Sequence, residues 1–241
     1  MEGNPHRLIL TGDDFGRSPK VNAQIEHWHR AGALTQASLM VNEAGVEEAV
    51  AIVRRNPALR VGLHLTLCDG PASDGAVMSH SPALAGLRFA FFPGARSWLR
   101  GEIAAQFARF RALGFAATYW DGHTHLHQHP VVFALTLPIA RGHGFRFTRL
   151  VREPGPMGIL PGVFSMLSAY AIPRLRAAGI GFADAVFGLR KSGCMDLDEV
   201  RRAVNRAASG TTEIYFHPGA EEILTDPTPV ADIVRCAAEK S

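Results

Sequence analysis

The segment Tyr119–His129 holds the densest group of side chains that could bind a metal or move a proton. It reads Y-W-D-G-H-T-H-L-H-Q-H, so Asp121 shares its phase with four alternating histidines: His123, His125, His127 and His129. Alternate side chains of an extended chain share one face, and neutral imidazole is the commonest protein ligand of metals. The segment therefore predicts several imidazoles directed into one space. A solvated histidine-rich loop is the open alternative.

Other chemically capable residues follow short apolar runs elsewhere in the chain: Asp13 with Asp14, His64, Arg149 and His217. In parallel α/β folds the active site lies at the carboxyl ends of the strands. Taken singly, each of these residues has an ordinary structural explanation, such as a helix cap, a core histidine, a surface ion pair or a turn. Their common position after predicted strands favours one shared site.

One carboxylate and two imidazoles are sufficient for an open metal site, because zinc hydrolases use three protein ligands and leave a position for water. The metal lowers the pKa of that water to about 7 and polarises a carbonyl. A neighbouring carboxylate can then act as base, and a further histidine can protonate the leaving group. Adjacent residues of an extended chain point to opposite sides. Asp13 and Asp14 can therefore share a site only if the chain turns there.

Short apolar runs alternate with helical patterns along the whole chain, which we interpret as a single domain over residues 1–241. The predicted strands are Arg7–Thr11, Ala37–Val41, Arg60–Leu67, Ala117–Gly122, Arg146–Val151, Gly181–Gly188 and Thr212–His217. The predicted helices are Ser18 to about Gly32, Glu43–Arg55, Ser97–Leu113, Pro130–His143, Val163–Ala178, Asp196–Ala208 and Pro229–Glu239. This alternation predicts an α/β fold, an irregular (β/α) barrel of about seven parallel strands. An open doubly wound sheet is the competing arrangement.

Two connections are unusually long, Cys68–Arg96 and Arg152–Gly162. The first contains the apolar patch Phe89–Phe92, and the second leads into Val163. Connections of this size are usually lids or binding loops. We therefore expect both to border a binding site.

The composition argues against several other classes of protein. The net charge is only +3 and the basic residues are scattered, so no nucleic-acid partner is expected. No apolar run approaches the ~18 residues of a spanning helix, and the first residues do not read as a signal peptide. The three cysteines are far apart and form no C-x-x-C pair. A cytoplasmic location is the expectation.

Four motifs stand in order along the chain: Asp13-Asp14-Phe15-Gly16, Gly62-Leu63-His64, Asp121-Gly122-His123-Thr124-His125-Leu126-His127 and His217-Pro218. This ordered set resembles the YdjC-like carbohydrate deacetylases, from about residue 8 to residue 220. The resemblance implies an irregular (β/α) barrel and metal-dependent removal of an acetyl group from N-acetylated sugars.

The resemblance also implies roles by position. Asp14, His64 and His123 become the ligands of a divalent metal ion, with Mg²⁺ and Zn²⁺ both left open. Asp13 becomes the general base, and His217 an acid or a partner of the oxyanion. The remaining candidates are substrate contacts: Arg149, His125 and Phe92.

Within the family the chain is most similar to the hopanoid-biosynthesis-associated branch, which implies an N-acetylglucosaminyl hopanoid lipid as substrate. The apolar residues of the two long connections would receive its lipid part. The expected partners are therefore an N-acetylated sugar or glycolipid, with transient contact to a membrane surface and no transmembrane segment. An apolar lid could equally serve as the contact of a homodimer.

Three alternatives to a deacetylase remain open. Two histidines and a carboxylate also form the iron site of non-haem oxygenases. Another barrel metallohydrolase would act on a phosphate or a cyclic amide. A non-catalytic sugar- or metal-binding protein would retain the site without turnover.

Overall fold

The computed structural model describes residues 7–156, 158–207, 210–220 and 223–238, and one curled parallel sheet organises them. The strands are β1 (Arg7–Phe15), β2 (Gln36–Leu39), β3 (Arg60–Leu65), β4 (Trp120–Gly122), β5 (Ala185–Phe187) and β6 (Thr211–Phe216). Their order is β4-β3-β2-β1-β6-β5, the order of a barrel opened between β4 and β5. A doubly wound sheet would reverse direction at a switch point. The predicted α/β barrel class is therefore confirmed, as an open half-barrel.

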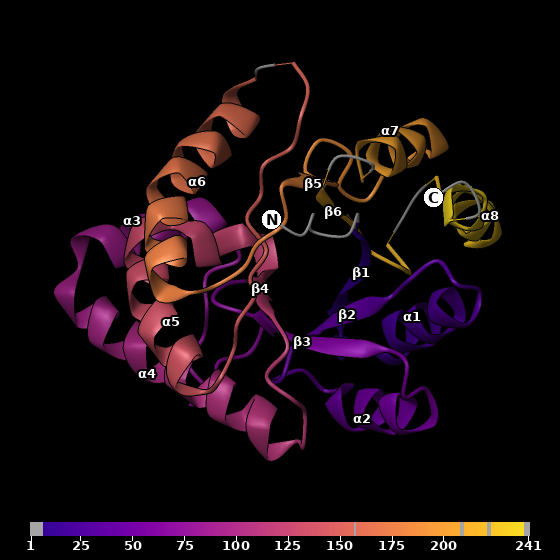
Figure 1. Ribbon diagram of the computed structural model, residues 1–241. Coiled ribbons are helices and arrows are strands. Elements are labelled where there is room, and N and C mark those ends of the chain that lie inside the picture. The colour runs from indigo at the N-terminus through magenta and orange to yellow at the C-terminus, as the bar shows by residue number, and fades with distance from the viewer. Residues whose placement is uncertain (1–6, 157, 208–209, 221–222, 239–241) are drawn as a thin grey trace.

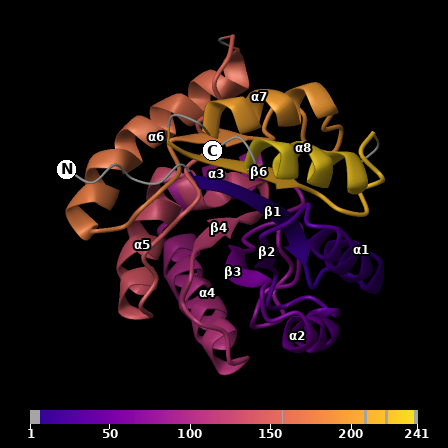
Figure 2. The same cartoon turned by 45° about the vertical axis from the view of Figure 1, so that its right-hand side comes forward.

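Helices surround the sheet on its outer side, as Figures 1 and 2 show. They are α1 (Pro19–Arg30), α2 (Val46–Arg55), α3 (Pro82–Phe91), α4 (Pro93–Ala112), α5 (Pro130–Gly142), α6 (Ile159–Ala178), α7 (Leu197–Ala207) and α8 (Thr228–Ala238). The start of α1 has the predicted chemistry: the Ser18 hydroxyl accepts from the backbone N–H of Val21, and Pro19 holds the first position. Within the described residues, no helix combines the length and apolarity needed to cross a bilayer.

The predicted strand Arg146–Val151 is the main difference from the expected seven. It makes only single parallel bridges, Thr148 to Trp120 of β4 and Phe147 to Gly181 ahead of β5. Backbone bonds accompany them, from Arg149 N to Trp120 O (3.2 Å) and from Thr148 N to Gly181 O (3.0 Å). We call residues 146–149 the seam, because they connect the two open edges of the sheet. The barrel is thus six strands and a bridged seam.

The two long connections contain more regular structure than the sequence suggested. The segment Cys68–Arg96 folds into α3 and the first turn of α4, and α6 begins at Ile159, four residues before the predicted Val163. The predicted helix ends Ala208 and Glu239 lie outside the described residues. Both former loops therefore contribute helices to the walls of the site.

Small residues in the sheet make room for a buried aromatic ring beneath the site. Tyr119 lies against Gly62 of β3, where an added Cβ would collide with its ring. The Tyr119 hydroxyl lies 3.1 Å from the Ser38 hydroxyl of β2. Ser38 in turn donates to Asp121, 2.7 Å away, so the packing of this layer reaches the functional carboxylates.

Candidate active site

A bulge in β1 brings the two adjacent aspartates to one site. The register of β1 against β2 shifts between Gly12 and Phe15, and Asp14 has a φ of 63°. Aspartate is one of the few residues that enters this left-handed region. The bulge supplies the turn that an extended Asp13-Asp14 pair would lack, and both residues line the same pocket.

Asp14, His64 and His123 form a buried cluster that could hold a metal ion. Asp14 Oδ1 lies 3.0 Å from Nδ1 of His123 and 3.4 Å from Nε2 of His64. Asp14 Oδ1 and His123 Nε2 are buried without a hydrogen-bond partner among the described residues. Although burial acts in the opposite direction, the two histidines hold the pKa of Asp14 well below its usual range. An ionised oxygen and imidazole nitrogens at one point suit a divalent cation.

Asp121 lies behind this cluster and orients one of its ligands. Its Oδ1 accepts from Nδ1 of His64 at 2.7 Å, which directs Nε2 of the same ring toward Asp14. Burial alone would lower the pKa of His64, but Asp121, Asp13 and Asp14 raise it to about 10. A carboxylate behind a histidine ligand is the usual way of fixing its tautomer and orientation.

Arg149 is a buried cation that holds three carboxylates. It donates to both oxygens of Asp13 (2.6 and 2.8 Å), to Glu213 (2.9 Å), and pairs with Asp121 at 3.0 Å. Despite burial, these carboxylates raise the pKa of Arg149. A second group that could hold a metal, Asp13 with His64 and Asp121, is less suited to a cation, because both of its carboxylates already pair with the guanidinium.

Asp69 and Arg17 extend the polar end of the site and were not predicted. Arg17 donates to Asp14 (3.1 Å) and to Asp69 (3.0 Å), and Asp69 lies 3.6 Å from Nε2 of His123. Asp69 follows the predicted strand Arg60–Leu67, so the rule that sites form after strand ends could have identified it. Its φ of 49° places it, like Asp14, in a region that few residues adopt.

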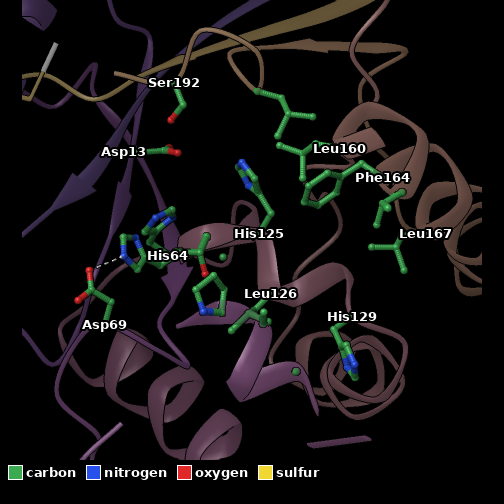
Figure 3. Close-up of a pocket in the computed structure, with 18 of the residues that line it drawn as sticks. Asp13, His64, Asp69, His125, Leu126, His129, Leu160, Phe164, Leu167 and Ser192 are labelled. Atoms are coloured by element: carbon green, nitrogen blue, oxygen red, sulfur yellow. Dashed lines mark ion pairs between the residues drawn. The ribbon is translucent and has the colours of Figure 1, made fainter. Parts of the chain in front are cut away.

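Three of the four alternating histidines, His123, His125 and His129, line one pocket as predicted, but the extended chain expected to direct them there is absent. β4 ends at Gly122, and a 3₁₀ turn (η1, His123–Gln128) follows, with positive φ at Thr124 and His125. The four rings therefore reach different partners. His123 faces Asp14, His125 lies 3.0 Å from the Tyr215 hydroxyl, and His127 donates to the carbonyl of Arg149. His129 lies against Gly86 of α3, away from the polar end (Figure 3).

One pocket of about 900 Å³ contains the cluster at one end and an apolar wall at the other. Asp13, Asp14, His64, His123 and His217 line the polar end. The apolar wall comes mainly from α3 and α6, through Leu87, Leu160, Phe164 and Leu167. Figure 3 shows His125 between these two ends. Burial lowers the pKa of His125 well below its usual range, so this ring is neutral.

Two residues predicted to contact substrate lie elsewhere. Arg149 is fully buried beneath the pocket, where its nitrogens meet carboxylates and its guanidinium covers the Tyr215 ring at 4.5 Å. Phe92 is exposed at the junction of α3 and α4, and the pocket wall is made by other residues of α3. Tyr215 was missed, although it alternates with His217 along β6 and so shares its face.

Comparisons with known proteins show the family of the chain and proteins that share its fold. The family model described as YdjC-like protein matches residues 7–238. The carbohydrate deacetylase of Mus musculus is 33% identical over an alignment of 243 positions, which covers 88% of this chain and 78% of that protein. The carbohydrate deacetylase of Geobacillus stearothermophilus is 30% identical, covering 95% and 93%. A suggested cellobiose-phosphate cleavage protein from Enterococcus faecalis shares the fold, with a TM-score of 0.68, 18% identity, and coverage of 97% and 94%.

Proposed function

The chain belongs to the YdjC-like protein family, and from that premise we propose that it is a metal-dependent N-deacetylase of acetylated sugars. The observation that carries this proposal is the contact of Asp14 with two histidines next to Asp13, at the inner end of a pocket. The deacetylase relatives support the reaction. The cluster supports the hydrolytic chemistry, because an acetamide needs both an activated water and a stabilised oxyanion.

Different residues of the site bind the metal and accept the proton of the attacking water. Asp14, His64 and His123 would hold a divalent ion, and that ion would polarise the acetyl carbonyl and lower the pKa of a water to about 7. Asp13 accepts the proton of the attacking water. The two hydrogen bonds from Arg149 fix the direction of the Asp13 carboxylate.

The opposite side of the pocket serves the leaving group and the sugar. His217 lines the pocket next to Tyr215 and donates a proton to the departing amine. His125 is neutral, and the Tyr215 hydroxyl holds its Nε2. Such a ring offers an uncharged hydrogen-bond partner to the acetamide or to a sugar hydroxyl.

The apolar wall supports a substrate with a lipid part, and we extend the proposal to an N-acetylglucosaminyl hopanoid lipid. Leu160, Phe164 and Leu167 of α6 face the pocket opposite the polar end, where an aglycone attached to the sugar would lie. A small free sugar would leave this wall in contact with water, as in the unbound protein, and would forgo the gain of about 25 cal/mol per Å² of apolar surface that an aglycone would bury. A cytoplasmic location belongs to the same proposal, and the unpaired cysteines support it.

Release of acetate tests the proposed reaction. Purified protein would be incubated with N-acetylated sugars of increasing length and with an N-acetylglucosaminyl lipid, before and after chelation of divalent ions. We expect acetate from at least one substrate, loss of release after chelation, and recovery when a metal is returned. Turnover without oxygen would exclude an oxygenase. Metal binding without acetate from any substrate would support a non-catalytic binding protein and contradict the proposal.

Asp13→Asn tests the role of the base. It should keep the bound metal and lose about 10²–10⁴ of turnover, the range of a general base. Thr136→Ser is a matched control, because Thr136 is buried in α5 and is not part of the pocket wall. Near-normal turnover in Asp13→Asn would show that another group takes the proton.

A further inference from the structure

Exposed apolar side chains lie on the two helices that form the apolar wall of the pocket. They come from the outer face of α3 and the first half of α6, and their exposed fractions range from 47% to 92%. We call this set the apolar rim: Leu84, Leu87, Phe91, Ile159, Val163 and Met166. Soluble proteins seldom leave such a group in contact with water unless it has a partner.

The apolar rim is continuous with the inside of the pocket. Leu87 and Val163 belong both to the rim and to the pocket wall, and the same wall leads inward to the candidate metal cluster. Along α6, Ile159 and Met166 point outward while Phe164 and Leu167 line the pocket. Whatever covers the rim therefore lies at the entrance through which a substrate must pass.

The helices that carry and flank the rim have exposed charge of one sign. None of the chain's 22 acidic residues lies in α3, α5, α6 or the first nine residues of α4. Exposed arginines occur there instead, with Arg88 on α3 and Arg96 and Arg100 on α4. Arg96 and Arg100 line a shallow groove with Tyr170 of α6. The guanidinium of Arg174 lies over the Tyr170 ring, 3.7 Å from its centroid. The face therefore combines apolar side chains with positive charge.

From these observations we infer that the apolar rim docks on the surface of a bilayer that contains anionic lipid. Apolar side chains enter the boundary between headgroups and acyl chains, and nearby arginines attract the lipid phosphates. A second copy of the chain is a poorer occupant. A two-fold interface would place this face against itself, and arginine would meet arginine with no exposed acidic residue on α3, α4 or α6 to compensate.

Docking would place the pocket entrance at the level of the lipid headgroups. A substrate with a lipid anchor could then present its sugar without leaving the bilayer, and only the headgroup would enter the pocket. The inference rests on the proposed function only for this purpose, because binding to a membrane requires no turnover. Membrane binding and acetate release can therefore fail independently.

Sedimentation with vesicles tests the inference. The whole protein would be mixed with vesicles of phosphatidylcholine alone, or of phosphatidylcholine with about a quarter phosphatidylglycerol, which carries the anionic charge that arginines attract. We expect partition onto the anionic vesicles, weakened by salt. Arg88→Gln should lower the partition coefficient about fivefold, the effect of one basic residue near an anionic surface. Ile159→Ser combined with Met166→Ser should lower it about tenfold or more.

Ile223→Ser is the matched control. Ile223 is also an exposed apolar residue, but it lies in a groove beside α7 and α8 with three aspartates. It should change partition less than about twofold, because apolar area lost there never meets lipid. The Ile159/Met166 variant should keep its melting temperature and its acetate release from a soluble sugar, since neither residue lines the pocket.

Three results would overturn the inference. The first is equal partition of the protein onto neutral and anionic vesicles. The second is an equal loss of partition in Ile223→Ser and in the Ile159/Met166 variant. The third is a dimer in light scattering that the Ile159/Met166 substitutions dissociate, which would identify a second copy as the occupant.

Discussion

Replacement of Arg149 by methionine should destabilise the protein far more than it weakens substrate binding. Methionine keeps much of the length of the side chain and removes its charge. Arg149 is fully buried, and it contacts three carboxylates that are themselves buried: Asp13, Asp121 and Glu213. In the variant these carboxylates would lose the guanidinium that they share.

The expected loss follows from the cost of an unpaired buried charge. Removal of one partner of a buried ion pair costs about 3–5 kcal/mol. For a domain of this size each kcal/mol lowers the melting temperature by about 2–4 °C, so the fall should be about 6–20 °C. Arg174→Met is the control: Arg174 is exposed on α6, and its loss should cost about 1 kcal/mol or less.

The dependence on pH provides a second measurement. Burial would raise the pKa of Asp121, but Arg149 and His64 lower it below its usual range. A carboxyl with a lowered folded-state pKa stabilises the protein above its unfolded pKa, and that contribution is lost as the pH falls through the folded value. Without Arg149 the folded-state pKa of Asp121 rises, because the guanidinium that pairs with it is gone. The difference in stability between wild type and Arg149→Met should therefore be largest near neutral pH and shrink as the pH falls below about 5.

Urea unfolding of both variants, without substrate and at several pH values, would measure these differences. Acetate release at several substrate concentrations would give KM. If Arg149→Met lowered the free energy of unfolding by less than about 1 kcal/mol at neutral pH and also raised KM, the reasoning would be refuted. In that case Arg149 would contact the substrate, as the sequence alone suggested.

Four further variants test other parts of the structure. His123→Ala should abolish metal binding and acetate release, whereas His129→Ala should reduce release only mildly. An equal loss of acetate release in the two variants would indicate that the alternating histidines bind the metal by themselves. Glu26→Gln should cost about 1 kcal/mol or less near neutral pH. Hydrogen bonding to Arg55 lowers the pKa of Glu26 to about 2, so this difference should vanish in urea titrations as the pH falls from about 4.5 toward 2. Gly62→Ala should lose about 1–3 kcal/mol in thermal unfolding through collision with the ring of the buried tyrosine beneath it; an unchanged melting temperature would contradict that packing.

The sequence predicted those parts of the fold that local chemistry determines. Ser18 and Pro19 are typical of a helix start, and α1 begins there. Gly114, Gly144 and Gly179 follow the ends of α4, α5 and α6 with positive φ, as glycines after helices commonly do. The same signal, Ser81 followed by Pro82, begins α3, where the Ser81 hydroxyl accepts from Leu84 N. It was overlooked because glycine and proline are frequent in that segment, and Gly86 lies inside the helix. The glycine and proline content of the segment is typical of a loop, whereas the Ser81 cap indicates a helix.

The site was harder to predict because its contacts join distant parts of the chain. Positions after strands predicted one shared site that includes Asp14, His64 and His123, and the family resemblance implied these three as metal ligands. The structure brings them together. The role of Asp121 behind His64, and the burial of Arg149 beneath the pocket, depend on side-chain directions that no local pattern contains. The alternation of the histidines was misleading, because the chain stops being extended at Gly122.

The backbone of Asp14 affects how mutagenesis of the site should be interpreted. Its φ of 63° suits aspartate and asparagine, whereas a left-handed conformation costs most other residues about 1–2 kcal/mol. Asp14→Ala would therefore combine loss of a ligand with backbone strain in the central strand of the sheet, and an alanine scan would overstate its chemical role. Asp14→Asn keeps the conformation and removes only the charge. It is the cleaner probe, and a comparison of the two variants would separate the energy stored in the bulge from the energy of metal binding.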